Sequence, residues 1–172
     1  QMKYDRKIQG LSLKVSPLGE NDRLITLLSE QEGITRFAAP GARRPKSKLA
    51  AASPLNFLEL HVAGKSELKR ISQLKVLRSF NRLGESLETL AAAQAMSELS
   101  LLLIGKDDPQ QGFLSALLIH LERLERLNIK SPNKNKNALA ASVQSCVHLL
   151  TIGGYGIPIQ ECTHTRVPLD PP

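Results

Sequence analysis

The amino-acid sequence predicts an all-β part followed by an all-α part: a small barrel of about five strands at residues 1–80 and a helical bundle at residues 81–172. Two observations lead to this fold class. Apolar residues alternate with period two in short segments before residue 80, whereas after it they recur at spacings of three and four. The charge divides at the same place, because residues 1–80 hold 15 Lys and Arg against 7 Asp and Glu, and residues 81–172 hold 8 against 9.

Strand patterns bounded by Gly and Pro turn signals occupy residues 7–15, 23–29, 34–39, 57–63 and 68–80. The residues expected to share an apolar face are Leu11, Leu13 and Val15 in the first segment and Leu58, Leu60 and Val62 in the fourth. The apolar residues of the fifth segment are Leu68, Ile71, Leu74, Val76 and Leu77. A closed barrel is the economical arrangement, because it removes the exposed edges of an open sheet. The OB-fold is the common five-stranded barrel.

Helical patterns follow at residues 82–104, from Asp108 to about residue 127, and at residues 138–152. The expected apolar stripes are Leu83, Leu87, Leu90, Ala91, Ala95, Leu99 and Leu102; then Phe113, Leu114, Leu117, Leu118, Leu121, Leu124 and Leu127; then Leu139, Val143, Cys146, Val147 and Leu150. Asp108 and Pro109 predict the start of the second helix, with Glu122 and Arg126 as an ion pair within it. Residues 131–137 are polar and predict a loop.

The composition excludes several classes of protein. With Cys146 and Cys162 as its only cysteines, the chain of 172 residues has too few for a disulfide scaffold or a zinc-ribbon array, and this favours a reducing cytoplasm. We expect no membrane-spanning helix and no signal peptide, because no segment is long and apolar enough. A start at Gln1-Met2 and an end at Pro171-Pro172 are typical of a fragment.

The densest cationic feature is the segment GARRPKSKL at residues 41–49, which contains Arg43, Arg44, Lys46 and Lys48 and no acid. We call these four side chains, with the loop that holds them, the basic loop. Crowded cations repel one another, so the pattern favours an anionic partner such as a phosphate backbone. The alternative is a solvated, flexible loop that aids solubility. Further cations in the same half favour the first interpretation: Arg36, Lys65, Lys69, Arg70, Lys75 and Arg78.

Catalytic and metal sites are not indicated. The sequence contains no HExxH, GxSxG or GxxxxGK[ST] motif, so we expect no enzyme. Asp107-Asp108 is interpreted as part of a helix cap, and His120 and His148 as core or boundary residues. Cys162 and His164 are the weak metal candidates. A zinc site needs about four ligands, and Cys146 and His148 come from a separate helix whose i and i+2 positions do not face one way.

The segment PLGENDRLITLLSEQEGITRFAAPGARRPKSKL, residues 17–49, resembles the N-terminal region of the RecO family of bacterial DNA-repair and recombination mediators. Its GE-x-D-x-L, E-x-G and GARR-type loop motifs occur in the family's order and spacing. The segment LLTIGGYGIPIQEC, residues 149–162, is similar to the family's later Gly-Tyr, Pro and Cys passage.

The resemblance implies an N-terminal OB-fold and a C-terminal helical domain. It also implies binding of single- and double-stranded DNA, annealing of complementary strands, and assistance with RecA loading together with RecR. The helical domain would contact the acidic C-terminal tail of the single-strand DNA-binding protein. By this resemblance, DNA contact is expected first at the basic loop. It is expected by charge also at Arg36, Lys65, Lys69 and Arg70. Many members carry a four-Cys zinc motif that this chain lacks, so no cofactor is expected.

Only 3% of the residues are aromatic, which predicts binding through phosphates with little base stacking. Phe37 and Phe57 are the stacking candidates on the barrel, unless they belong to the core. Two other functions stay open at this point: a basic OB-fold module for RNA, and an adaptor whose cationic half recruits acidic protein tails.

Overall fold

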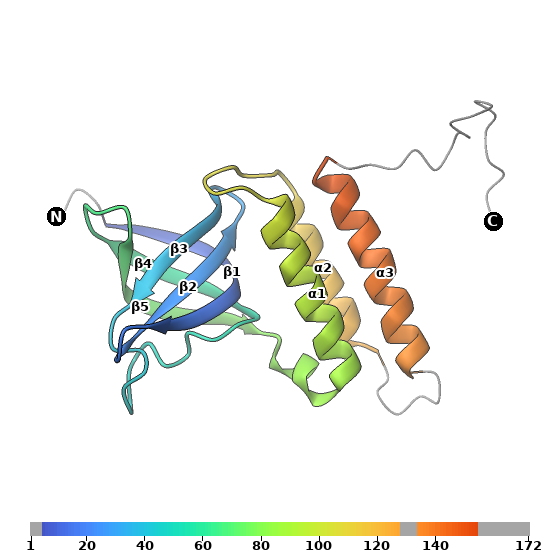
Figure 1. Ribbon diagram of the computed structural model, residues 1–172, viewed down its shortest axis with the longest axis horizontal. Helices are drawn as coiled ribbons and strands as arrows, with labels where there is room; N and C mark the ends of the chain where they lie inside the picture. Colours follow the sequence, from blue (N-terminus) through green and yellow to red (C-terminus); the bar gives the residue numbers. More distant parts are fainter. Residues whose placement is uncertain (1–4, 128–133, 155–172) are drawn as a thin grey trace.

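The computed structural model describes residues 5–127 and 134–154, with the side chains of 134 and 135 left undescribed. Five strands form a closed barrel in the order β1-β2-β3-β5-β4, and three helices stand together beside it (Figure 1). The strands are β1 (Arg6–Leu18), β2 (Asp22–Ser29), β3 (Gly33–Ala39), β4 (Asn56–Ala63) and β5 (Lys69–Ser79). A 3-10 turn, η1 (Asn81–Glu85), leads to α1 (Leu87–Leu103), α2 (Phe113–Glu125) and α3 (Lys134–Ile152). The predicted fold class is confirmed.

The barrel is antiparallel except where it closes. β3 and β5 run parallel and pair only at Phe37 with Lys69 and Ala38 with Arg70. Its interior contains Leu58, Leu60 and Val62 of β4, as the alternation predicts.

The predicted face of β1 is wrong at one residue. The pairing of β1 with β2 shifts between Ser12 and Lys14, so Leu13 occupies a bulge. A bulge interrupts the alternation of side chains. Leu11 and Leu13 therefore pack with the helices, whereas Val15 packs inside the barrel.

The apolar residues of the fifth segment divide between the barrel interior and the surface. Ile71 is buried and Leu74 packs against the interior, but Leu68, Val76 and Leu77 are 37–39% exposed. The pairing of β5 with β4 shifts register twice, and each shift interrupts the alternation of side chains along the strand.

The helix expected over residues 82–104 is divided into η1 and α1 by Ser86. The Ser86 side chain accepts a hydrogen bond from the Thr89 backbone amide and caps α1. This break rotates the predicted stripe, so Leu87 and Leu102 are about 80% exposed (79% and 83%). The buried face of α1 consists mainly of small side chains, together with Met96: Thr89, Ala92, Ala93, Met96, Ser97 and Ser100.

The α2 helix begins later than predicted. Asp108 and Pro109 are not its cap, because residues 105–108 contact the barrel: Lys106 bridges to Gly33 and Ile34. The helix begins after Gly112, and its expected stripe from Phe113 to Leu124 is otherwise confirmed. Its first turn is capped by Glu30 of the β2–β3 turn, which accepts hydrogen bonds from the backbone amides of Gly112 (3.2 Å) and Ser115 (3.1 Å).

Replacing Glu30 by Ala is expected to lower the stability of the protein by about 1 kcal/mol, because the exposed amides of a helix N-terminus lose their acceptor and a favourable negative charge. Thermal unfolding of Glu30→Ala should show a midpoint about 2–4 °C below that of the unchanged protein. Glu30→Gln keeps an acceptor oxygen and should fall between the two. A midpoint of Glu30→Ala equal to that of the unchanged protein would show that this cap contributes nothing.

The α3 helix begins at Lys134, so residues 134–137 are helical and not part of the predicted loop; residues 131–133 lie outside the described part of the chain. The predicted stripe of α3 is mostly wrong. Leu139, Val143 and Val147 are 67%, 56% and 37% exposed, while Ala138, Ser145 and Leu149 are buried. Small side chains on both α1 and α3 let these helices approach closely, and this packing, which a hydrophobicity count does not detect, decides which face is buried.

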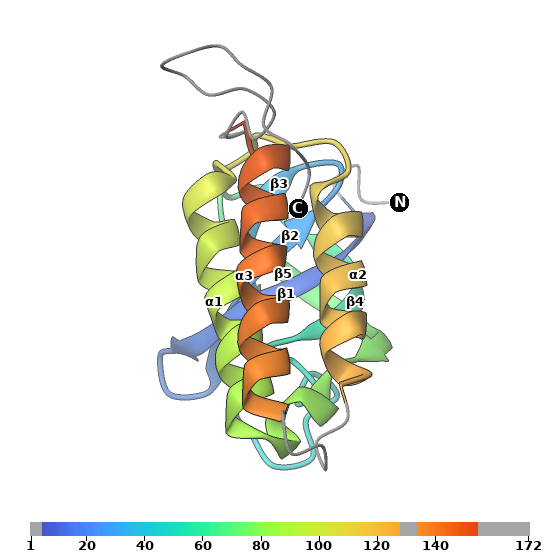
Figure 2. The same ribbon diagram turned by 90° about the vertical axis from the view of Figure 1, so that its right-hand side faces the viewer.

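The barrel and the helices share one hydrophobic core. Leu11, Leu13, Leu28 and Ile34 on the outside of the barrel form a single cluster with buried residues of all three helices. Figure 2 shows the three helices side by side in front of the strands. The Arg78 guanidinium of β5 lies 4.5 Å above the Phe80 ring and pairs with Glu122 and, at 2.9 Å, with Glu125 of α2. The helices therefore extend the core of the barrel.

Two histidines connect α2 with α3. The expectation of a core residue is confirmed for His120, which is buried, whereas His148 is exposed. Nε2 of the buried His120 lies 2.8 Å from Nδ1 of the exposed His148, and the predicted Glu122–Arg126 pair is present at 4.0 Å. Burial lowers the pKa of His120 below its ordinary value of 6.5, and the neighbouring His148 and Arg123 lower it further.

This lowered pKa predicts acid sensitivity. Because unfolded His120 takes up a proton near pH 6.5 and the folded form resists it, the stability contribution is complete above that pH. It is lost as the pH falls from there towards the folded pKa. Urea unfolding at pH 7.5 and 5.5 should show a larger loss of stability for the unchanged protein than for His120→Gln, which does not titrate. An equal loss in both proteins would contradict this assignment.

No helix among the described residues is long and apolar enough to span a membrane.

Candidate nucleic-acid interface

The basic loop lies between β3 and β4 and is anchored to the barrel at both ends. Ala42, Leu49 and Ala52 are buried in the barrel interior. The Gly41 amide donates to the Asp22 carboxylate at 2.7 Å, and the Arg23 guanidinium donates to the Ala52 carbonyl at 3.0 Å. The loop is thus held at both ends by its small and apolar residues.

Arg43, Arg44, Lys46 and Lys48 are all exposed. Within residues 5–127 and 134–154, none of them has an acidic partner within 4 Å. The Arg43 guanidinium donates one hydrogen bond, at 2.6 Å, to the Gly19 carbonyl of the β1–β2 turn. This bond holds the side chain in place and leaves other N–H groups of the guanidinium available. Lys46 has a φ of 58°, in the left-handed region, which is typical of tight turns. The loop therefore turns tightly at this residue.

The other predicted DNA-binding residues form a second group at the barrel's closing seam. Arg36 is the only exposed residue of β3, and it precedes Phe37, which pairs with Lys69. Arg70 is exposed and pairs with Ala38, and Lys65 is exposed on the β4–β5 turn. The parallel pairing of β3 with β5 therefore brings together cations that are more than 30 residues apart in the sequence.

The two cationic groups are connected through β3. Arg36 lies three residues before Ala39, where β3 ends and the basic loop follows, a distance of about 10 Å along the strand. The chain therefore leads from the seam cation Arg36 into the basic loop along the end of a single strand.

The sequence pattern groups Arg78 with the cations that favour an anionic partner, but the structure gives this side chain a different role. Both of its carboxylate partners, Glu122 and Glu125, come from α2, and its guanidinium covers the Phe80 ring. It connects the barrel to the helices through these two carboxylates. The sequence gives no local signal for this role, because the acids lie 44 and 47 residues away.

Aromatic side chains offer no stacking surface on the described residues. Phe37, Phe80 and Phe113 are 0–2% exposed, and the half-buried Phe57 packs against the core shared with the helices. The two candidates for stacking, Phe37 and Phe57, are therefore core residues. The prediction of phosphate contacts without base stacking is consistent with this arrangement.

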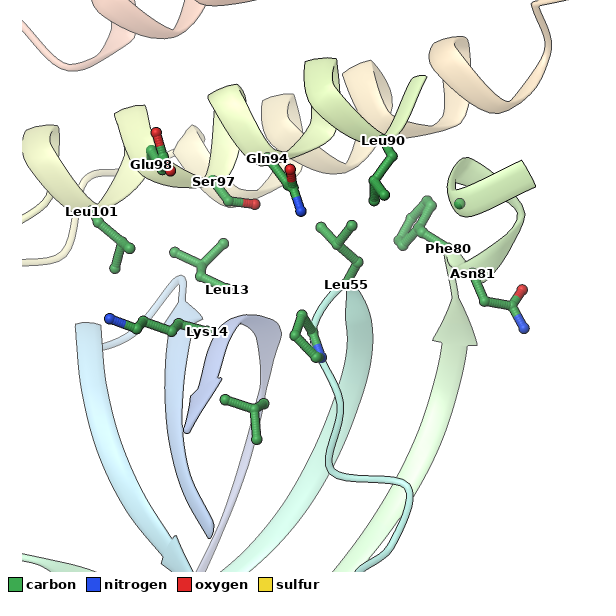
Figure 3. Close-up of a pocket in the computed structure, with 13 residues that line it drawn as sticks. Leu13, Lys14, Leu55, Phe80, Asn81, Leu90, Gln94, Ser97, Glu98 and Leu101 are labelled. Atoms are coloured by element: carbon green, nitrogen blue, oxygen red, sulfur yellow. The ribbon is translucent and has the colours of Figure 1, made fainter. Parts of the chain in front are cut away.

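A cleft of about 610 Å³ separates the barrel from α1, but it is a poor phosphate site. Figure 3 shows Leu13, Leu55 and Leu90 pointing into it. Its charged lining residues are Lys14 and Glu98, which offset each other. The cationic character of the molecule thus lies elsewhere, at the basic loop and the seam.

The weak metal candidates Cys162 and His164 lie outside the described residues. Among residues 5–127 and 134–154, no group of three or more His, Cys, Asp or Glu side chains is placed to hold a metal ion. Cys146 is a free thiol whose pKa is raised by burial, which favours the protonated, unreactive form.

Comparisons with known proteins agree with this geometry. Residues 2–80 match the family described as recombination protein O N terminal, and residues 84–172 match recombination protein O C terminal. A protein named DNA repair protein RecO from Prochlorococcus marinus (strain MIT 9303) is 61% identical over 99% of this chain and 64% of its own length. RecO proteins of Synechococcus sp. (strain WH7803) and Cyanothece sp. (strain PCC 7425 / ATCC 29141) are 54% and 37% identical, over 63% and 55% of their lengths.

This chain spans a little under two thirds of the length of the relatives most similar to it among these, with 64% and 63% covered. The matches cover both the barrel and the helices, and they agree with the motifs at residues 17–49 and 149–162. The chain belongs to the RecO family.

Proposed function

We propose that this protein is a non-catalytic mediator of DNA repair and homologous recombination that binds single- and double-stranded DNA through the phosphate backbone, in the bacterial cytoplasm on the nucleoid. The observation that carries the proposal is the basic loop: four exposed cations without acidic partners among the described residues, on a loop anchored in the barrel core. The relatives named DNA repair protein RecO support the biological role.

Strand annealing follows from the same arrangement. A protein that contacts phosphates and does not stack on bases leaves the base edges available to a complementary strand. Cations along the loop and seam lower the repulsion between two polyanions that must approach each other. No step of this activity requires a cofactor.

The helices supply a surface for protein partners. A groove of about 700 Å³ lies between α2 and α3, where Ile119 and Val147 are exposed beside the single cation Arg123. An acidic peptide with an apolar end suits this surface, which fits contact with the C-terminal tail of the single-strand DNA-binding protein. With RecR, this contact would help RecA load on the coated strand.

The decisive experiment is annealing of complementary strands coated with single-strand DNA-binding protein, with the full chain and with a variant carrying alanine at the four basic-loop cations. The unchanged protein should accelerate annealing and the variant should not. Arg126→Gln, which removes an exposed charge from the end of α2, serves as a control and should anneal normally. Equal annealing by the unchanged protein and the basic-loop variant would remove the loop from the mechanism.

Two alternatives have their own outcomes. Preference for folded RNA over single-stranded DNA at one salt concentration would indicate an RNA-binding module. Binding of an acidic, Phe-ended peptide without any binding of DNA would indicate an adaptor.

Loss of peptide binding in Arg123→Glu, with DNA binding retained, is the result expected if the α2–α3 groove is the protein-contact surface.

A further inference from the structure

A pocket of about 440 Å³ lies in the seam of the barrel, between the first residues of β3 and the β4–β5 turn. It exists because β3 changes partner along its length. Gly33 and Ile34 bridge to Lys106 of the α1–α2 connection, whereas Phe37 and Ala38 pair with β5. Between these two contacts, Thr35 and Arg36 line an opening that no strand fills.

Four cations line this pocket: Arg6, Arg36, Lys69 and Lys106. Arg6 and Lys106 have carboxylate partners at 2.6 Å, Glu32 and Glu67 respectively. Arg36 and Lys69 have no carboxylate within 4 Å in the described part of the chain. These two cations, on adjacent strands, are therefore available to an anion.

The pKa of Lys106 responds to the charge of Arg36, one of the two cations of the pocket that lack a described carboxylate partner. The hydrogen bond and charge of Glu67 raise the pKa of Lys106, while the charge of Arg36 acts in the opposite direction. Arg36 and Lys106 are thus near enough to repel each other. An anion between Arg36 and Lys69 relieves this repulsion.

A buried hydroxyl in the same pocket lacks a partner. Thr35 is 9% exposed, and its Oγ1 is buried without a hydrogen bond to any described residue. A buried hydroxyl without a partner is unfavourable and rare in folded proteins. Thr35 lines the pocket, so a rotation about its χ1 bond would turn the buried hydroxyl towards a bound ligand with an acceptor oxygen.

The acids of the pocket limit the ligand's charge. Glu67 is neutralised by Lys106, but Asp107 also lines the pocket and has no cationic partner within 4 Å in residues 5–127 and 134–154. A carboxylate there disfavours several adjoining phosphates and can accept a hydrogen bond from a base N–H group. The volume lies within the range of small-ligand pockets, about 300–1,000 Å³.

We propose that the seam pocket binds one nucleotide of the DNA strand, with its phosphate between Arg36 and Lys69 and the Thr35 hydroxyl donating a hydrogen bond to it. The inference rests on the proposed DNA binding and adds a defined contact to it. A free mononucleotide offers the same chemistry, so the experiment separates the two sources.

The experiment measures binding of an oligothymidylate by fluorescence anisotropy over a range of salt concentrations. Thr35→Val removes the hydroxyl without changing charge or size, and should weaken binding about threefold to tenfold with an unchanged salt slope. Its thermal midpoint should equal or exceed that of the unchanged protein, because a buried hydroxyl without a partner is lost. Arg36→Gln/Lys69→Gln should reduce the slope by about 0.7, the value for one phosphate of a single strand.

Lys14→Gln/Arg126→Gln is the charge-matched control, since both residues are exposed and lie outside the pocket; its slope should change much less. If the unchanged protein binds no DNA, the proposed function fails. If it binds, and the seam variants behave like the control, only the seam proposal is overturned. Thymidine monophosphate binding as tightly as the strand, with strand binding unaffected in the seam variants, would assign the pocket to a free nucleotide and also overturn the proposal.

Discussion

Replacing Arg43, Arg44, Lys46 and Lys48 together by alanine is expected to weaken binding of single-stranded DNA on the order of 100-fold near physiological salt, because the counterions that these cations release stay on the DNA. The plot of log affinity against log salt should become shallower by about 3, at about 0.7 per phosphate contact. Titration of a labelled oligonucleotide at several salt concentrations measures both quantities.

Because these side chains are exposed, the test separates the loss of charge from a loss of stability. The four cations have no described acidic partner, and the loop is held by Ala42, Leu49 and Ala52. Alanine at the cationic positions therefore removes charge and keeps these buried anchors, at the loss of the exposed hydrogen bond from Arg43 to Gly19. The thermal midpoint should therefore change little. A salt slope unchanged from that of the original protein would show that the loop does not contact DNA.

Phe80→Ala is expected to cause the largest loss of stability, about 3–5 kcal/mol, because a fully buried ring is removed from the core that the barrel shares with the helices. It also removes the ring beneath the Arg78 guanidinium. A fall of about 10 °C in the thermal midpoint corresponds to this loss for a chain of this size. Phe80→Leu keeps much of the volume and should lose far less.

The shared core predicts the form of this transition as well. Circular dichroism of the helices and fluorescence of a probe on the barrel should report the same midpoint in both proteins, because the helices bury their apolar faces against the outside of the barrel. Separate midpoints for barrel and helices would contradict a common core, whatever the size of the loss.

The sequence predicts the strands well because their alternation and their turn residues are local signals. The basic loop is equally visible, since four cations without an acid need no tertiary information. Its anchoring by Ala42, Leu49 and Ala52 is not visible, because small residues carry a weak hydrophobic signal.

Several of the errors share a physical origin: contacts between distant segments. Glu30 caps α2 from 82 residues away, so the cap predicted at Asp108 is wrong. Arg78 belongs to the helices because of Glu122 and Glu125. The seam group of Arg36 and Lys69 depends on a parallel pairing that the periodicity of each strand does not specify.

The short contact between β3 and β5 has a consequence for motion. Two residue pairs hold the barrel closed there, whereas every other neighbouring pair of strands forms a longer ladder. Opening of a structure begins where the fewest hydrogen bonds must break. Local fluctuations of the barrel are therefore expected to separate Phe37 from Lys69 first, and the barrel widens at its cationic seam without disturbing the core beneath the helices.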